Sequence, residues 1–156
     1  MIALLTLSPE GLATARVLHE HLPEAELFMH RTAGASDVAS FDRLTDQVRE
    51  LWDHAEGLVC FVPTGVVVRA IAPCLKSKLT DPAVVVCDVL GRWAVSLLSG
   101  HEGGANDLTL RVANLLGAEP IITTTTEAVK DLVVGVGCRK GTAAEVIESA
   151  VREGLD

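Results

Sequence analysis

The segment Ser99–Asn106 (SGHEGGAN) carries the residue types best suited to acid–base chemistry. The imidazole of His101 can take up or release a proton near neutral pH, which suits it to proton transfer. Three glycines within five residues let the backbone turn sharply or approach a bound group closely. The segment follows an apolar run and precedes a helical pattern, a position in which exposed N–H groups point at a ligand. It predicts a catalytic histidine in a ligand-binding loop, with a structural turn carrying an exposed histidine as the alternative.

Thr64, Gly65 and Arg69 form a second candidate site, within the sequence PTGVVVR at 63–69. Thr64 can cap the helix that the pattern predicts over 64–72, and the neighbouring N–H groups can then hold an anion. Arg69 follows one to two helical turns later, and its guanidinium can clamp a carboxylate through two hydrogen bonds. A plain helix cap with a surface arginine explains the same residues, and on the residues alone this reading is favoured.

Asp88 closes the very apolar run 83–87, and Lys78 lies in the polar connection 75–81 before it. A carboxylate at the end of a buried strand can have a raised pKa and serve as a base. Asp88 also stands three residues before Gly91, which is typical of a turn, and the turn reading is favoured for Asp88 taken alone.

Apolar runs alternate with helical patterns along most of the chain. We expect extended segments at 2–7, 25–29, 57–62, 83–87, 93–98, 121–126 and 132–136, and helices at 9–22, 38–51, 64–72, 105–116 and 142–153. This alternation predicts an α/β fold, a three-layer α/β/α sandwich with a mostly parallel sheet and a hairpin at 83–98. Ligands of such sheets bind beyond the carboxyl ends of the strands, and we expect the three candidate segments to meet there in one pocket.

The composition excludes several classes of protein. The chain has 156 residues, of which 49% are hydrophobic, and a formal net charge of −8. The length suits one main domain, the apolar fraction excludes intrinsic disorder, and the charge argues against nucleic acid and membrane surfaces as partners. No apolar run approaches the ~18–20 residues needed to cross a bilayer, and the first residues lack the features of a signal peptide. The four cysteines form no CxxC pair, so the sequence supports no protein metal site and predicts reduced thiols in the cytoplasm.

Taken in order, these segments closely resemble the cobalt-precorrin-5A hydrolase family, that is, the cobalamin biosynthesis protein CbiG. The resemblance is strong over residues 57–126. It rests on the following motifs: Thr64-Gly65, Val68-Arg69, Ile71-Ala72-Pro73, Lys78, Asp81-Pro82-Ala83-Val84, Asp88, Gly91-Arg92, Ser96-Leu97-Leu98-Ser99-Gly100-His101, Gly103-Gly104-Ala105-Asn106 and Ile122-Thr123-Thr124. By the same resemblance, 1–126 is the amino-terminal α/β domain of the family, and 127–156 is the truncated start of its carboxy-terminal domain.

The resemblance implies a hydrolase acting on carbon–carbon bonds in anaerobic cobalamin (vitamin B12) biosynthesis. Such an enzyme opens the ring A lactone of cobalt-precorrin-5A with water and releases the extruded bridge carbon, with its methyl group, as acetaldehyde. The cobalt arrives inside the tetrapyrrole substrate, so no separate cofactor is implied. Other enzymes of the pathway and a second copy of the chain are the further partners that we expect.

This reaction needs a base, donors for an oxyanion and cations for the acetate and propionate groups of the substrate. We expect His101 to be the base, with Asp88 as second choice, and the N–H groups of Gly103, Gly104 and Ala105 to form the oxyanion site. The remaining residues expected to bind or orient the substrate are Thr64, Gly65, Arg69, Lys78, Ser99 and Asn106. Two alternatives stay open: a truncated, non-catalytic module that binds the corrinoid, and a nucleotide- or phosphosugar-binding α/β domain, although the latter lacks a standard phosphate fingerprint.

Overall fold

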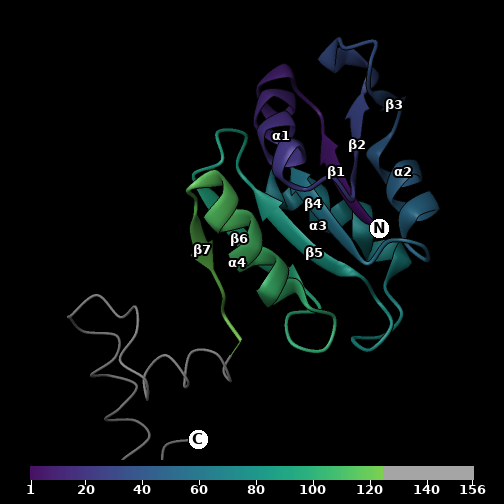
Figure 1. Cartoon of the computed structure of the whole chain (residues 1–156). Coiled ribbons are helices and arrows are strands. Elements are labelled where there is room, and N and C mark those ends of the chain that lie inside the picture. The colour runs from purple at the N-terminus through teal and green to yellow at the C-terminus, as the bar shows by residue number, and fades with distance from the viewer. Residues whose placement is uncertain (125–156) are drawn as a thin grey trace, which may run out of the picture. The chain divides into compact units, whose positions relative to one another are not determined.

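The computed structural model describes residues 1–124, which form a seven-stranded sheet with helices on both faces (Figure 1). The α/β class and the mostly parallel sheet predicted from the sequence are confirmed. The predicted second domain at 127–156, with its strand and helix, lies outside the described residues. The unit Met1–Ile122 holds these elements: β1 (Ile2–Thr6), α1 (Pro9–His21), β2 (Ala25–His30), β3 (Ala39–Phe41), α2 (Leu44–Leu51), β4 (Gly57–Phe61), α3 (Thr64–Ile71), β5 (Ala83–Cys87), β6 (Trp93–Leu98), α4 (Ala105–Leu116) and β7 (Glu119–Ile121).

The strands stand in the order β3-β2-β1-β4-β5-β6-β7, and every neighbouring pair is parallel except β5 with β6. The chain moves outward from β1 to β3 and then crosses to β4, so the strand order switches between β1 and β4. The predicted hairpin at 83–98 is confirmed, with Cys87 opposite Ala94 and Val84 opposite Leu98. As a result, β6 and β7 run in the direction opposite to the five strands before them.

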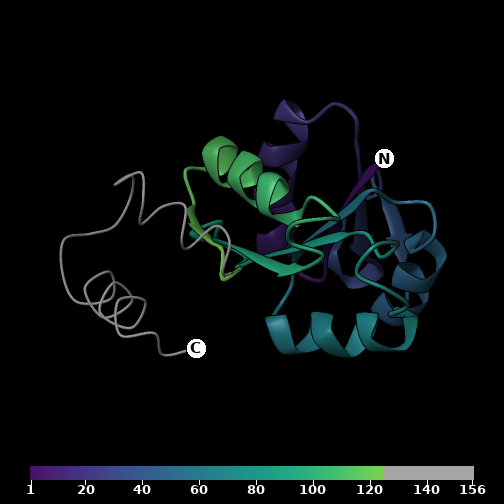
Figure 2. The ribbon, with the colours of Figure 1, turned by 90° about the horizontal axis from the view of Figure 1, so that it is seen from below.

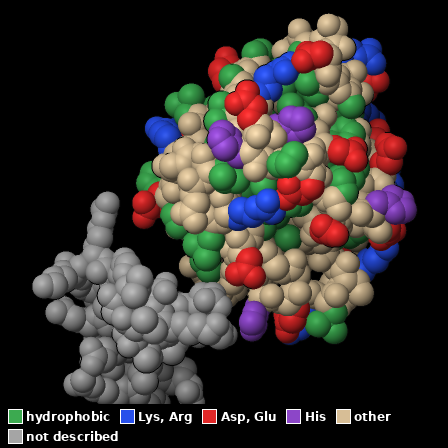
Figure 3. Space-filling model, in the orientation of Figure 1, with side chains coloured by type: hydrophobic (Ala, Val, Ile, Leu, Met, Phe, Trp, Pro, Cys, Tyr) green, Lys and Arg blue, Asp and Glu red, His purple; other side chains and the backbone are tan. Residues whose placement is uncertain are grey.

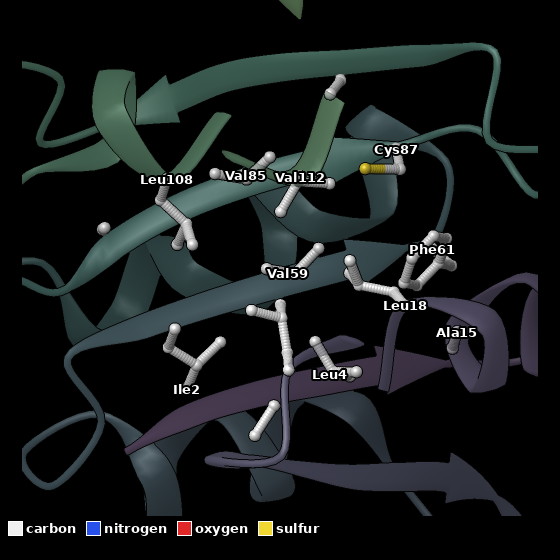
Figure 4. Close-up of a cluster of buried hydrophobic side chains, with 14 of the residues drawn as sticks. Ile2, Leu4, Ala15, Leu18, Val59, Phe61, Val85, Cys87, Leu108 and Val112 are labelled. Carbon is white, nitrogen blue, oxygen red and sulfur yellow. The ribbon is translucent and has the colours of Figure 1, made fainter. Parts of the chain in front are cut away.

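Two apolar cores lie on opposite faces of the sheet, because side chains alternate along each strand. On one face, alternate residues of β1, β4 and β5 pack against α1 and α4 (Figure 4), among them Leu4, Val59 and Val112. On the other face, α2 and α3 cover the same strands, with Leu5 and Val67 in the core. Figure 2 shows the helices above and below the sheet. Each fully buried leucine or valine stabilises the fold by about 1.5–3 kcal/mol, so the central strands are firmly held.

The ends of the helices follow the local signals in the sequence. The hydroxyl oxygen of Ser8 accepts a hydrogen bond from the N–H of Gly11 at 3.1 Å, and Pro9 occupies the first helical position of α1. Helix α4 ends at Gly117, whose φ of +69° is a left-handed conformation that favours glycine.

The outer strands β6 and β7 are covered on one face only within the described part of the chain. Helix α4 packs against β5, β6 and β7, and buries Ala94 completely. On the other face, Trp93, Val95 and Ile121 lie beyond the edge of α3 and remain exposed or half-buried. We call these three side chains the open β6–β7 face.

Three local predictions were wrong. The pattern from Val38 onward is not the start of a helix, since Ala39–Phe41 forms β3 and α2 begins at Leu44. Pairing with β2 outweighs the helical spacing there, because Phe41 is buried against the sheet. The extended segment predicted at 121–126 begins earlier, as β7 at Glu119–Ile121. Thr64 does not cap α3, because Pro63 occupies the cap position and no side chain bonds to the first turn.

Candidate functional site

The glycine-rich loop lies at the opposite edge of the sheet from Asp88. Leu98, the last residue of β6, pairs with Val84 near the start of β5, so the loop that follows lies where the parallel strands begin. The prediction that all three candidate segments share the carboxyl edge was therefore wrong. The hairpin reverses the chain once, and this single reversal moves His101 away from Thr64 and Asp88.

The loop folds back on itself through a few short contacts. The hydroxyl of Ser99 donates to the carbonyl oxygen of Asp81 at 3.1 Å, and the carbonyl of Ser99 accepts from the N–H of Ala105 at 3.1 Å. Ser99 has a φ of +59°, a left-handed conformation that is uncommon for a residue with a side chain and is often found at functional sites. A Cβ atom at Gly103 would lie 2.3 Å from the Cβ of Ser99, so only glycine fits this turn.

The closed loop presents His101 and Glu102 to solvent. The ammonium group of Lys78 lies 3.2 Å from a carboxylate oxygen of Glu102, and this hydrogen bond holds the pKa of Glu102 below its usual value. The structure thus brings Lys78, Ser99 and His101 into one neighbourhood, which we call the histidine loop cluster. Lys78 is already paired with a carboxylate within it.

The N–H groups expected to form the oxyanion site differ in whether they already donate a hydrogen bond within the loop. The N–H of Ala105 is occupied by Ser99, so it is not available to a substrate. Among residues 1–124, the N–H groups of Gly103 and Gly104 have no hydrogen-bond acceptor, and Gly104 has a φ of +81°. Asn106 is buried, and its side-chain oxygen accepts from the hydroxyl of Ser96 at 2.8 Å, so it anchors α4 to β6.

At the carboxyl edge, Arg69 curls back along α3. Its Nη1 donates to the carbonyl oxygen of Gly65 at 3.1 Å, which places the guanidinium beside Thr64 and the first turn of the helix. Within residues 1–124, every other lysine and arginine has a carboxylate oxygen within 4.0 Å, whereas Arg69 has none. Figure 3 shows the acidic and basic side chains interspersed on the face formed by α1 and α4. Arg69 is therefore a cation of this part of the chain that can take an external carboxylate without breaking an ion pair.

Asp88 holds the β5–β6 turn. Its carboxylate oxygens accept from the backbone N–H groups of Arg92 and Trp93 at 2.7 and 2.9 Å and from the Nε of Arg92 at 2.9 Å. Partial burial by itself would raise the pKa of Asp88, but these hydrogen bonds outweigh it and lower the pKa below its usual value. A carboxylate held in this way is a weak base, and the turn reading of Asp88 is confirmed.

A cavity of about 400 Å³ opens between the start of α3 and the outer strands. Most of its lining is apolar, and Asp88 and Thr64 stand at its rim. The lining residues are Val62, Pro63, Thr64, Val86, Cys87, Asp88, Val89, Trp93, Val95 and Ile121. Its size and apolar character are typical of small-molecule sites, which occupy about 300–1,000 Å³.

Trp93 lines the cavity but was not among the candidate residues selected from the sequence. Its side chain is 46% exposed at the mouth of this cavity. The available signal was the sequence WAVSLL at 93–98, which is apolar on both faces although one crossover helix follows it before the next strand.

The remaining chemistry of the described residues is limited. Burial raises the pKa of Cys60 and that of Cys87 to about 12, so these thiols are inert. Residues 1–124 contain no group of three histidine, cysteine, aspartate or glutamate side chains placed to hold a metal ion. No helix in this range is long and apolar enough to span a bilayer.

Comparison with known proteins identifies the family. Residues 46–127, more than half of the chain, match the family described as Cobalamin synthesis G N-terminal, or CbiG_N. The chain belongs to this family. The histidine loop cluster, Arg69 and the apolar cavity all lie inside the part of the chain that matches CbiG_N.

Two curated relatives are named cobalt-precorrin-5A hydrolase. The protein from Salmonella typhimurium is 41% identical over 127 residues, which cover 81% of this chain and 36% of the relative. The protein from Priestia megaterium is 48% identical over 100 residues, which cover 64% of this chain and 27% of the relative. This CbiG_N chain therefore spans about a third of the length of the relatives it matches.

The fold of a CbiG_N protein is also found in a solved structure. A crystal structure of a cobalamin biosynthesis protein G homolog from Sulfolobus solfataricus superposes with a TM-score of 0.63 and 20% sequence identity. The match covers 97% of this chain and 46% of that chain.

Proposed function

We propose that this chain supplies the amino-terminal part of a cobalt-precorrin-5A hydrolase. In this reaction water opens the ring A lactone of a cobalt-bound tetrapyrrole, and the extruded bridge carbon leaves with its methyl group as acetaldehyde. The observation that carries the proposal is the identity of 41% and 48% to two relatives of that name. Both candidate regions lie within residues 46–127, which match the family.

We assign the proton transfer to His101. It stands at the exposed tip of a loop that is fixed by Ser99 and Gly103, so its ring can approach a substrate without unfolding the loop. The N–H groups of Gly103 and Gly104 are the donors that we propose for the oxyanion of the opening lactone. Lys78 can release Glu102 and bind a carboxylate of the substrate instead, since the pair is exposed and weakly held.

We assign carboxylate binding at the other edge to Arg69, with Thr64 and Gly65 shaping the surface around it. Asp88 is a poor base because its pKa is low. We therefore assign Asp88 the role of holding Arg92 and Trp93 in place. The thiols of Cys60 and Cys87 are buried and unpaired, which supports a reducing compartment such as the cytoplasm.

The decisive experiment incubates the full chain anaerobically with cobalt-precorrin-5A and assays acetaldehyde together with the absorption spectrum of the bound tetrapyrrole. We expect stoichiometric release of acetaldehyde over time. Tight binding of the tetrapyrrole without acetaldehyde would contradict the hydrolase and favour a non-catalytic corrinoid-binding module. Absence of binding would contradict both.

A further inference from the structure

The open β6–β7 face is an apolar surface without a covering helix in the described part of the chain. Val95 lies opposite Val86 in β5 and opposite Ile121 in β7, so the three side chains project from the same face of the sheet. Trp93 projects two residues earlier on the same face, with 46% of its side chain exposed. Together they form one side of the 400 Å³ cavity, and the start of α3 forms the other.

The charges around this surface favour a ligand that carries carboxylates. Arg69 is bonded to the carbonyl of Gly65, next to Thr64 at the rim, and has no carboxylate partner within residues 1–124. Arg92, the residue before Trp93, is paired with Asp88. The apolar floor thus lies next to helix α3, which carries an available guanidinium on its exposed surface outside the cavity lining. The other lysines and arginines of the described residues are paired with carboxylates.

We infer that the open β6–β7 face is the floor on which the tetrapyrrole macrocycle lies, with the ring stacked on Trp93 and a peripheral carboxylate bound by Arg69. This inference rests on the proposed function and adds the surface that binds the substrate. An indole offers a wide, rigid apolar face to the conjugated part of the macrocycle, and contact with an aromatic side chain buries a large apolar area. Val95 and Ile121 extend the floor, and the guanidinium of Arg69 binds a carboxylate at the periphery of the macrocycle.

The experiment measures dissociation constants for the full chain by equilibrium dialysis with two stable probes. The first is cobyrinic acid, a cobalt corrin polycarboxylate, and the second is cobyric acid, its amidated counterpart. The variants are Trp93→Ala, which removes the aromatic floor, and Trp93→Phe, which retains a flat ring. Leu110→Ala is the matched control, because Leu110 is 44% exposed on α4, across the sheet from the proposed site.

We expect Trp93→Ala to raise the Kd of both probes by about tenfold, which corresponds to about 1.4 kcal/mol. Trp93→Phe should bind almost as the unaltered chain does, and Leu110→Ala should be indistinguishable from it. Circular dichroism of each variant confirms that the fold is retained, and the backbone bond from Trp93 to Asp88 does not depend on the side chain.

Four results would overturn the inference. If the unaltered chain binds the probes and Trp93→Ala binds equally well, the macrocycle lies elsewhere, although the proposed function stands. An equal loss in Trp93→Ala and Leu110→Ala would show that the effect is not local. If sedimentation shows a dimer that Trp93→Ala dissociates, a second copy of the chain covers this face. If the unaltered chain binds neither probe, the proposed function fails as well.

Discussion

Arg69→Gln gives the most direct test of carboxylate binding at the carboxyl edge. The guanidinium is exposed, donates only to the carbonyl of Gly65 and has no carboxylate partner within the described residues. Its removal leaves no buried group without a partner, so the free energy of unfolding should change by less than about 0.5 kcal/mol. The substitution therefore tests binding without disturbing the fold.

The magnitude of the effect follows from exposure. Hydrogen bonds to charged groups contribute about 1.5–3 kcal/mol when shielded, but solvent and salt reduce an exposed pair to about 1 kcal/mol. Since 1.4 kcal/mol is tenfold in affinity, we expect the Kd for a corrin polycarboxylate to rise about five- to tenfold. The loss should shrink at high ionic strength, where exposed charges are screened.

The assay compares cobyrinic acid with its amidated counterpart at low and high salt. Arg111→Gln is the control, because Arg111 is also exposed but pairs with Glu24 on α4's side of the sheet. Arg69→Lys should recover part of the affinity, since the charge remains and the planar fork is lost. An unchanged Kd in Arg69→Gln, or an equal loss for both probes, would refute the assignment of Arg69 to a carboxylate.

Three further predictions concern the two edges of the sheet. His101→Ala should lower acetaldehyde release by about 10²–10⁴-fold, the usual contribution of a general base, without changing the melting temperature; undiminished turnover would exclude His101 as the base. Gly103→Ala should destabilise the chain by about 1–3 kcal/mol in urea unfolding, because the new Cβ would lie 2.3 Å from the Cβ of Ser99. Gly65→Ala is the control, because its Cβ would meet no atom closer than 3.4 Å. This control should unfold at nearly the same urea concentration as the unaltered chain. Asp88→Asn should lower the free energy of unfolding at neutral pH. The difference from the unaltered chain should decrease as the pH falls through the low pKa of Asp88, since a carboxylate with a lowered folded-state pKa stabilises the fold only while ionised. A difference in the free energy of unfolding that is independent of pH would contradict this.

The order of elements could be read from the sequence because the central strands are apolar on both faces. The runs at 2–6, 57–61 and 83–87 are buried throughout, and Thr6 is the one polar residue within these three runs. The short strand Ala39–Phe41 could not be found in this way, because two of its three residues are exposed and only pairing with β2 defines it.

The candidate site was harder to predict because it depends on the direction of one strand. The hairpin itself was expected from the turn after Asp88, but its consequence for the loop after Leu98 is a matter of register and not of residue type. Residue type and spacing make His101 and Arg69 candidates whichever way the strand runs, so they could not reveal that the two lie at opposite edges. Trp93 was missed because its exposure results from the absence of a helix over β6 in residues 1–124, which no spacing in the strand itself records.

Strand β6 is the element that relates the two edges. It begins at Trp93 beside the turn of Asp88 and ends at Leu98, directly before Ser99. At about 3.4 Å per residue, its six residues span about 17 Å. A ligand confined to one edge would contact either Arg69 or His101, but not both. In the binding mode that we propose, a macrocycle with acetate and propionate arms that lies along the open β6–β7 face would extend from the guanidinium of Arg69 toward the histidine loop cluster. The separation of the two groups therefore favours an elongated polycarboxylate over a small anion as the ligand that uses both.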